Sequence, residues 1–461
     1  MSDDLRRLTR QLDADYARRF PRSRAYFERY GRSVLDGTSH AVRWNEPFMP
    51  VARHAEGAQV EDLDGHLWVD YWQGHLANLL GHNPPLIRQA LGAALEQRRG
   101  LQSGMVHEVE GEVAELVRRS TRAETVRFTT SGSLGTFYAV VLARAFTGRD
   151  LVLKVSGGWH GSQPFGLKGV SPRETSFDHL ESEGLSASTG AEIVLTRFND
   201  VEDLRARFAE LGDRVACFLF EPVLGAGGGM VGSREYVTEA RRLTETHGSL
   251  LLCDEIITGF RFRAGDLSQS YGIRPDLLIL GKIMGGGMPV AAVAGRRDVL
   301  ALSTRDSARV KFEGGTYSAH ELSLIAARTL LQHLESHGDR IYTELARSGA
   351  RLSSELERLA GDAGVPVYLP LSSDPALPGS SLVFVHFMQR DATPPTCPEE
   401  LARGRHPLIG ECLLKSLLLL EDVSTRSGVG AISTEHTDAN VDKTLEGYRA
   451  VFDRLKRAGL I

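Results

Sequence analysis

One lysine, Lys282, stands alone in the apolar, glycine-rich run "DLLILGKIMGGGMPVAAVAG" (276–295). No other charged residue occurs from Leu277 to Gly295. A lysine withdrawn from water has a lowered pKa, and its neutral amine is a nucleophile. The glycines at 285–287 carry no side chain, so a ligand can approach closely. We interpret Lys282 as a reactive amine, and the alternative is a lysine that extends from a sheet edge into water.

A carboxylate, Asp254, follows the apolar run "LLLC" (250–253) and precedes Lys282 by 28 positions (254 to 282). Such a run predicts a buried strand, which would put Asp254 at the strand's carboxyl end. A charge that leaves water needs a cation or a hydrogen-bond donor as its partner. Asp254 is therefore a candidate ligand-binding acid, and the alternative is a helix cap or a protein ion pair.

Two glycine-containing turns are suited to a phosphate group. Ser131, Gly132 and Ser133 join a predicted strand to a predicted helix. The free amides at a helix N-terminus bind anions, although simple N-capping by either serine is the alternative. Gly314-Gly315-Thr316 is a second candidate for phosphate contact.

The fourth candidate feature is an aromatic residue. Trp159 and His160 follow a predicted strand and two glycines in "KVSGGWHG" (154–161). Trp159 can stack on a flat heterocycle or simply pack within its loop. Pyridoxal 5'-phosphate (PLP) requires all four features: it forms a Schiff base with lysine, places an acid beside its pyridine nitrogen, carries a phosphate and offers a ring for stacking. A nicotinamide site would show G-x-G-x-x-G after the first strand, where this chain has none. No metal site is predicted.

Strands and helices that alternate through the middle of the chain must position these residues. The predicted strands are 125–130, 150–155, 192–198, 215–223, 249–256 and 276–281, and helical patterns between them cover 134–148, 201–212 and 234–248. Continuous apolar strands that alternate with helices predict an α/β fold with a mostly parallel, doubly wound sheet. Ligands of such sheets bind beyond the carboxyl ends of the strands.

The flanking segments predict a smaller α+β domain. A charged amphipathic helix is expected over the first 35 or so residues, a β-hairpin around Asp64-Gly65 and a helix over 84–99. A strand is expected at 381–387, and a surface loop at 388–407. The predicted division is an N-terminal helical segment with the hairpin, which belongs to the small domain (1–85), the large cofactor-binding domain (86–320) and the C-terminal small domain (321–461).

Composition narrows the class of protein. The 461 residues are 42% hydrophobic and 25% charged, with a net charge of −5, which predicts neither nucleic acid nor a membrane as a partner. No apolar run approaches the ~20 residues that span a bilayer. The four cysteines lack C-x-x-C spacing, and the N-terminus shows no signal peptide, so we expect a cytoplasmic protein with reduced thiols.

These stretches resemble the class III aminotransferases of PLP fold type I, and among them the glutamate-1-semialdehyde aminomutases and the β-amino-acid aminotransferases. The similarity extends from about residue 35 to the C-terminus. Its strongest pieces are "LLCDEIITGFRF", "LGKIMGGGMP", "ARAFTGRD", "GGWHG", "DLDGHLWVDY" and "GTYS".

The resemblance implies a role for each site residue. Lys282 would bond to the cofactor and move protons, and Asp254 would keep the pyridine nitrogen protonated. Gly132 and Ser133 would bind the phosphate with Thr316 of a neighbouring subunit, which implies a homodimer with shared active sites. Arg43 aligns with an arginine that binds a substrate carboxylate; the alternative is a surface arginine. The other implied cofactor contacts are Ser131, Trp159 (in place of the usual tyrosine), His160, Glu221, Ile256 and Gly315.

Three departures from the family pattern bear on the reaction. The usual "SGTEA" is "SGSLG" here, which puts Leu134 in place of a glutamate. The aminomutases read "EPVAGN" and "FEAGFVS", whereas this chain has Ala226 for the asparagine and Gly428 for the glutamate, with Arg426 two residues earlier. These differences argue against a strict aminomutase.

We therefore expect a PLP-dependent transaminase that exchanges an amino group between a small-molecule donor and acceptor. The favoured substrate is a β- or γ-amino acid whose carboxylate Arg43 holds. A glutamate-1-semialdehyde 2,1-aminomutase-like isomerase is the first alternative, and a diverged PLP enzyme such as a racemase, epimerase or decarboxylase is another. A non-catalytic binding protein of the same fold is the alternative from a different class, although it would need neither Lys282 nor Asp254.

Overall fold

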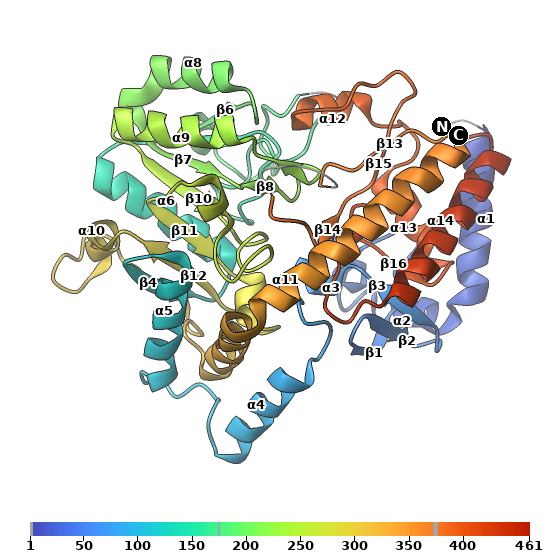
Figure 1. Cartoon of the computed structure of the whole chain (residues 1–461), viewed down its shortest axis with the longest axis horizontal. Coiled ribbons are helices and arrows are strands. Elements are labelled where there is room, and N and C mark those ends of the chain that lie inside the picture. Colours follow the sequence, from blue (N-terminus) through green and yellow to red (C-terminus); the bar gives the residue numbers. More distant parts are fainter. Residues whose placement is uncertain (1–2, 174–175, 372–376) are drawn as a thin grey trace.

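A seven-stranded sheet organises the centre of the molecule in the computed structural model, which describes residues 3–173, 176–371 and 377–461 (Figure 1). Its strand order is β4-β12-β11-β10-β7-β5-β6. The strands are β4 (Thr125–Thr129), β5 (Leu151–Val155), β6 (Ile193–Thr196), β7 (Val215–Phe220), β10 (Leu250–Asp254), β11 (Leu277–Leu280) and β12 (Ala291–Gly295). All six strands predicted from the sequence are therefore present in one sheet.

The sheet is mostly parallel, as expected, and β12 is its antiparallel member. This strand pairs antiparallel with both β11 and β4, while the remaining neighbours are parallel. Every residue of β5, β7, β10, β11 and β12 is buried, which is the pattern of a sheet covered on both faces. The run "AAVAG" of β12 was not predicted as a strand, because small residues between glycine-rich turns carry little strand signal.

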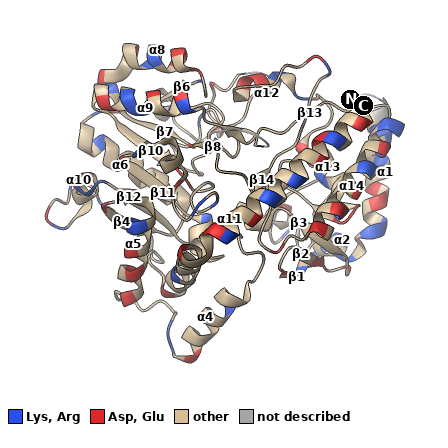
Figure 2. Ribbon diagram, viewed as in Figure 1, with Lys and Arg blue, Asp and Glu red and all other residues tan. Residues whose placement is uncertain are grey.

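Helices cover both faces of this sheet. Helix α6 packs on β7, β10, β11 and β12, while α9 packs on β10 and β7 and α5 on β4 (Figure 1). The helices of this part are α4 (Pro85–Glu96), α5 (Glu108–Thr121), α6 (Gly132–Thr147), α7 (Ala187–Ala191), α8 (Val201–Leu211), α9 (Arg234–His247) and α10 (Arg297–Leu300). Charges of both signs alternate along the exposed sides of α8 and α9 (Figure 2).

The two ends of the chain fold together beside the sheet. A second sheet has the order β1-β2-β3-β16, in which β16 pairs parallel with β3 across more than 350 residues of sequence (Val423 with Val69). Its strands are β1 (Ala52–Glu56), β2 (Gln59–Asp62), β3 (Leu67–Asp70) and β16 (Val423–Ser424). The predicted hairpin is confirmed, because β2 and β3 pair antiparallel around Gly65, whose φ of 91° favours glycine.

Long helices complete this part of the molecule. Helix α11 runs between the two parts of the molecule and packs on α4 and α5 at one side and on α14 at the other (Figure 1). The helices are α1 (Asp3–Arg19), α2 (Pro21–Tyr30), α3 (Gln73–Leu76), α11 (Glu321–Ala363), α12 (Pro398–Gly404), α13 (Glu411–Leu419) and α14 (Asp438–Arg457). No helix among the described residues is both long and apolar enough to cross a membrane. The domain limits 1–85, 86–320 and 321–461 remain a prediction.

The structure corrects three details of the sequence prediction. The first 35 residues form two helices, α1 and α2, because Pro21 starts a new helix. The segment 388–407 is not simply a surface loop, since it contains α12 and buries Met388, Cys397 and Leu401. The expected strand at 381–387 is split into β14 (Leu382–Val383) and β15 (His386–Phe387), which pair with β17 (Gly430–Ala431) and β13 (Val367–Tyr368). A last short pair is β8 (Val223–Leu224) with β9 (Met230–Val231).

Candidate active site

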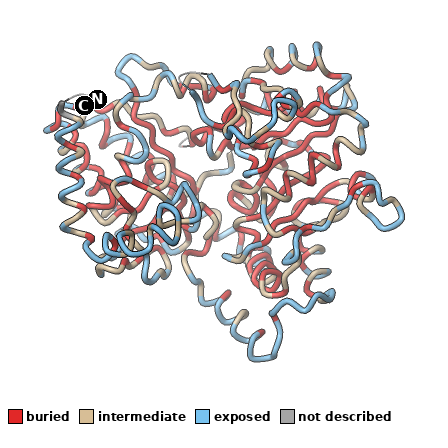
Figure 3. The backbone as a smooth tube through the Cα atoms, turned by 180° about the vertical axis from the view of Figure 1, so that it is seen from behind, coloured by how far each residue is buried: buried red, intermediate tan, exposed pale blue. Residues whose placement is uncertain are grey.

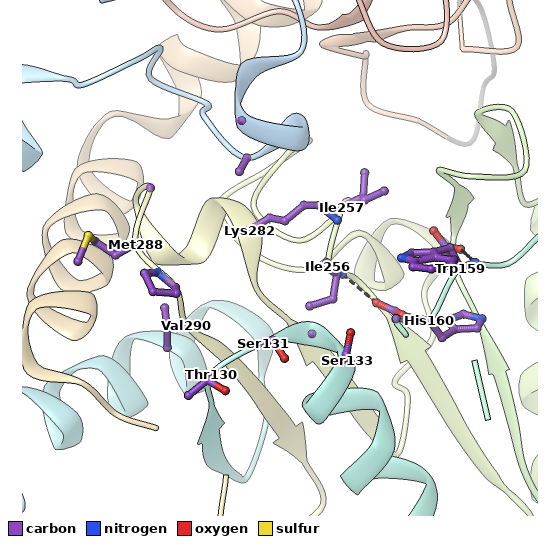
Figure 4. A pocket seen from close by; sticks show the side chains of 18 of the residues that line it. Thr130, Ser131, Ser133, Trp159, His160, Ile256, Ile257, Lys282, Met288 and Val290 are labelled. Carbon is purple, nitrogen blue, oxygen red and sulfur yellow. Dashed lines mark hydrogen bonds and ion pairs between the residues drawn. The ribbon is translucent and has the colours of Figure 1, made fainter. Parts of the chain in front are cut away.

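A cavity of about 540 Å³ opens at the carboxyl ends of the central strands (Figure 4). This size lies within the usual range for small-molecule and cofactor sites. Loops that follow β4, β5, β7, β10 and β11 each contribute at least one side chain to its wall. The expectation that chemistry gathers at this edge of the sheet therefore matches the position of the cavity.

Lys282 reaches into this cavity from a 3₁₀ turn (Lys282–Gly285) directly after β11 (Figure 4). Gly281 precedes it in extended backbone, where a Cβ would lie 2.8 Å from Ile256 Cδ1. Burial lowers the pKa of the Lys282 amine, and the nearby acids Asp254 and Glu221 only partly offset this effect. Within the described part of the chain, its Nζ has no hydrogen-bond or ion-pair partner. The amine is thus available for reaction.

Asp254 ends β10 and is held by two donors. Its Oδ2 lies 2.8 Å from His160 Nδ1, and its Oδ1 accepts the Ile256 backbone N–H at 3.1 Å. Both Asp254 and His160 are buried, and burial lowers the pKa of His160, so the neutral ring donates its Nδ1 proton to the carboxylate. His160 therefore fixes the orientation of Asp254 from the side away from Lys282.

Glu221 lies at the end of β7 and closes the wall near Trp159. Its carboxyl oxygens accept the backbone N–H groups of Trp159 (2.8 Å) and Gly225 (3.1 Å). Burial, followed by the charge of Asp254, raises the pKa of Glu221 to about 8. Glu221 thus holds a proton at neutral pH and fixes the backbone of the residue that presents the indole.

The opposite end of the cavity is formed by the N-terminus of α6. The Ser131 side chain caps the helix by accepting the Leu134 N–H at 3.4 Å, while Gly132 and Ser133 provide the first helical amides. A Cβ on Gly132 would lie 2.7 Å from Ile256 Cδ1, so this turn and the Ile256 side chain are closely packed. Unpaired amides and hydroxyls at a helix N-terminus form an anion site.

A buried lysine, Lys154, supports the loop that carries Trp159 and His160. Its Nζ is fully buried and donates to the carbonyl oxygens of Gly158 (2.9 Å) and Lys168 (2.6 Å). Burial lowers the pKa of this amine to about 7. The sequence prediction missed Lys154, because a single lysine in an apolar strand gives no indication of the carbonyls that surround it.

The structure brings most of the predicted site residues together. The cavity is lined by the predicted residues Ser131, Gly132, Ser133, Trp159, His160, Glu221, Asp254, Ile256 and Lys282. Gly315 and Thr316 do not line it; a Cβ on Gly315 would lie 3.2 Å from Thr130 Oγ1, and Thr316 is exposed. Arg43 does not line it either, but its Nε lies 3.5 Å from Nε2 of His75, the neighbour of the lining residue Gly74.

The sequence prediction also missed the wall on the side opposite Trp159. Gly74, Ala77 and Asn78 contribute to it, and they follow β3 in the N-terminal sheet rather than a strand of the central sheet. The segment "YWQGHLAN" offers the glycine Gly74 as a signal, but no local pattern indicates that this segment packs against the Lys282 turn. Gly287 to Val290 complete the wall.

The cavity fits PLP in chemical terms. The N-terminal amides and hydroxyls of α6 suit the phosphate, the Asp254 carboxylate suits a protonated pyridine nitrogen, and the Lys282 amine has no other partner among the residues that the structure describes. The phosphate, the pyridine nitrogen and the aldehyde of the cofactor thus each have a counterpart in this cavity.

Comparison with known proteins supports this assignment. The family model described as aminotransferase class III matches residues 41–366. The chain is 32% identical over 445 residues to a glutamate-1-semialdehyde 2,1-aminomutase from Laribacter hongkongensis, which covers 94% of this chain and 100% of that protein.

Two solved structures have the same fold. One is a β-phenylalanine aminotransferase from Variovorax paradoxus, with a TM-score of 0.84 and 28% identity over 99% of this chain and 98% of that one. The other is a glutamate-1-semialdehyde aminomutase from Pseudomonas aeruginosa, with a TM-score of 0.85, 22% identity and the same coverage.

Proposed function

The chain belongs to the class III aminotransferases, which are PLP-dependent enzymes, and we propose that it transfers an amino group between a carboxylate-bearing amino acid and a keto acid or aldehyde. A β- or γ-amino acid is the favoured donor. The observation that carries this proposal is that the Lys282 amine, which has no partner among the described residues, shares one cavity with Asp254 and Glu221. An arginine, Arg43, lies beyond the part of the wall that Gly74 forms.

Several residues of the cavity have a task in this reaction. When bound, PLP supplies an aldehyde that bonds to an amine and a ring that withdraws electrons from the adjacent carbon. Lys282 Nζ, with its lowered pKa, takes up and returns a proton. Asp254, oriented by His160, holds the pyridine nitrogen, and the α6 amides with Ser131 and Ser133 hold the phosphate.

Arg43 is proposed to bind the carboxylate of the substrate. It is exposed and is the last residue of a short turn (Ala41–Arg43). A guanidinium binds a carboxylate with two parallel hydrogen bonds, so it orients the substrate as well as attracting it. A β- or γ-amino group is favoured over an α-amino group because the chain is similar to a β-phenylalanine aminotransferase.

Aminomutase activity is the second candidate, supported by the names of the relatives. Two observations favour the transaminase. Gly428 has a φ of 90°, and a Cβ there would lie 2.7 Å from Val385 Cβ, so this backbone suits glycine rather than the glutamate of the aminomutases. Ala226 has no donor where the aminomutases carry asparagine. A solved structure with the same fold is named as a β-phenylalanine aminotransferase, and this similarity also supports the transaminase.

A homodimer is part of this proposal. Large apolar side chains are exposed around the loop after α4, which projects from the body of the molecule (Figure 3); they are Leu101 (76% exposed), Met105 (76%), Val106 (87%) and Tyr317 (59%). The Gln102 side chain donates to the Thr316 carbonyl at 2.8 Å, so this loop is joined to the predicted phosphate contact. Burial against a second copy would shield this apolar surface and bring Thr316 toward the partner's cavity.

The test is a substrate panel with the purified protein. With PLP, the parent should show a visible absorbance band that Lys282→Ala lacks, and it should form a keto product from a β-amino acid when a keto acid is supplied. Arg43→Ala should raise KM for the carboxylated donor about tenfold or more and leave kcat on a simple amine unchanged. Isomerisation of glutamate semialdehyde without any exchange with external acceptors would favour the aminomutase instead.

A further inference from the structure

The loop that carries Trp159 closes around one buried ammonium group. Lys154 Nζ, on β5, donates to the carbonyl oxygens of Gly158 at 2.9 Å, Lys168 at 2.6 Å and Gly166 at 3.5 Å. An ammonium has three N–H donors, so these carbonyls use all of them. The side chain is fully buried, and no acid forms an ion pair with it among the described residues. An internal cation therefore organises this loop.

Backbone hydrogen bonds fold the loop back on itself around this ammonium. The Gly157 N–H donates to the Gly169 carbonyl at 2.8 Å, and the Gly169 N–H donates to the His179 carbonyl at 3.1 Å. Farther along, the Glu181 N–H donates to the Leu167 carbonyl at 3.0 Å. Carbonyls that are ten positions apart in the sequence (158 to 168) are thereby brought to a single nitrogen.

The peptide between Gly158 and Trp159 is held at both of its polar atoms. Its carbonyl accepts from Lys154, and its N–H donates to Glu221 Oε1 at 2.8 Å. The carbonyl and the N–H of a trans peptide point in opposite directions within one plane, so the two contacts fix the orientation of that plane. This plane leads directly to the Cα of Trp159, and the direction of the indole is set with it.

Trp159 depends on its backbone because the core does not enclose its side chain. The residue lines the cofactor cavity and is 39% exposed (Figure 4). The next residue is held separately, since the His160 carbonyl accepts the Thr136 hydroxyl at 2.6 Å and its ring pairs with Asp254. Lys154 does not line the cavity. It therefore acts on the indole through the carbonyl that precedes Trp159.

The three contacts of Lys154 require its proton. Burial lowers the pKa of this amine to about 7; Glu221 at the end of β7 and Glu181 in the loop act to raise it, and Lys168 acts to lower it. His160 also faces the amine, whose charge helps to lower the pKa of that ring. A neutral amine has only two N–H groups and leaves one carbonyl without a donor. The loop is thus fully held below about pH 7 and loses a contact as the pH rises through that value.

We propose that Lys154 is a positioning residue for the cofactor: its ammonium acts through the Gly158 carbonyl to hold the Trp159 indole against the cofactor ring, and PLP binding weakens when the ammonium loses its proton. This rests on the proposed function, because the ring to be stacked is that of PLP. The coupling is reciprocal, so bound PLP favours the protonated amine to the same extent.

The experiment measures the dissociation constant of PLP by equilibrium dialysis with the apoenzyme of the parent and of Lys154→Met, from pH 6 to pH 9. Methionine keeps the length of the apolar stem but has no donor and does not titrate. Groups that titrate in both proteins, such as Lys282 and Glu221, cancel in the ratio of the two constants. Lys154→Met should bind PLP about tenfold more weakly than the parent at pH 6 and less than about twofold more weakly at pH 9.

Two further measurements keep the outcome decisive. Lys168→Met is the matched control, because this lysine lies in the same loop but donates to Gly190 and Ile193, and its ratio to the parent should not change with pH. The second measurement is the quenching of Trp159 fluorescence by acrylamide in the parent apoenzyme, with Trp159→Phe as the blank for the other tryptophans. Quenching should increase from pH 6 to pH 9, and this holds even if Lys154→Met does not fold.

The proposal is overturned if the ratio for Lys154→Met is the same at pH 6 and pH 9, because the side chain would then only fill space. Equal quenching of Trp159 at both pH values, or the same fall of the ratio in Lys168→Met, would also overturn it. Failure of the proposed function would appear separately, as a protein that binds PLP with this pH dependence but forms no keto product from any amine or amino acid.

Discussion

The pair His160–Asp254 provides the sharpest test of how the site is built. Replacing His160 by leucine removes the Nδ1 donor that lies 2.8 Å from Asp254 Oδ2 and retains a buried side chain of comparable size. Leucine is preferred to phenylalanine because it is shorter, which suits a site where Gly158 lies close to His160 Nε2.

The magnitude follows from the contacts of Asp254. In the variant, this buried carboxylate keeps one donor, the Ile256 N–H at 3.1 Å. A hydrogen bond to a charged group contributes about 1.5–3 kcal/mol, and its loss leaves the carboxylate free to turn away from the cavity. If that cost falls on cofactor binding, the dissociation constant for PLP rises roughly 10- to 150-fold.

The assay is a titration of the apoenzyme with PLP, followed by the visible absorbance band, alongside the melting temperature of the apoenzyme. His160→Asn is the matched control, because the asparagine Nδ2 can occupy the place of His160 Nδ1 and donate to Asp254. We expect the leucine variant to bind PLP at least tenfold more weakly and the asparagine variant to stay within about threefold of the parent.

The reasoning is refuted by a leucine variant that melts at a lower temperature but binds PLP with the parent's affinity. Such a result would mean that His160 only fills space. Equal weakening in the leucine and asparagine variants would also contradict it, because the donor would then not be the decisive feature.

Three more predictions follow from the same contacts. Lys154→Met should lower the melting temperature and weaken PLP binding, because two buried carbonyls lose their donor at ~1–3 kcal/mol each; unchanged melting would contradict this. The pKa of Glu221 rises from 4.5 to about 8 on folding. Its contribution to the stability of the folded protein is therefore fully present below pH 4.5 and is lost as the pH rises through 8. Between pH 5 and 8, the melting temperature of apo Glu221→Gln should fall by less than that of the parent. Val106→Asp, at a residue 87% exposed in one chain, should halve the mass measured by light scattering and weaken PLP binding, and a variant that remains a dimer would argue against this interface.

The sequence by itself determined the parallel strands of the central sheet and the edge of the sheet at which the reactive residues lie. Continuous apolar runs identify buried parallel strands, and a polar residue directly after such a run must lie at the carboxyl edge. Lys282, Asp254 and Ser131 were found in this way, because Asp254 ends its strand and the other two lie just beyond the ends of theirs. Parallel strands bring their carboxyl ends together, so local patterns were enough to predict that these residues meet.

Residues whose role depends on distant packing were placed only by the tertiary structure. His160 was predicted to contact the cofactor; it lines the cavity, and only the fold shows that it also hydrogen-bonds to Asp254. The antiparallel direction of β12 and the helix within 388–407 were likewise not visible, because neighbouring strands and buried contacts decide them rather than local propensity.

The substrate side shows the limit of sequence reasoning most clearly. Arg43, His75, Glu411 and Arg426 come from four separate segments, and the parallel pairing of β3 with β16 is what brings the segments of His75 and Arg426 together. No periodicity reports a contact across more than 350 positions. The sequence therefore determined which cofactor the chain is built to hold, whereas only the folded chain decided which arginine is free and which is already paired.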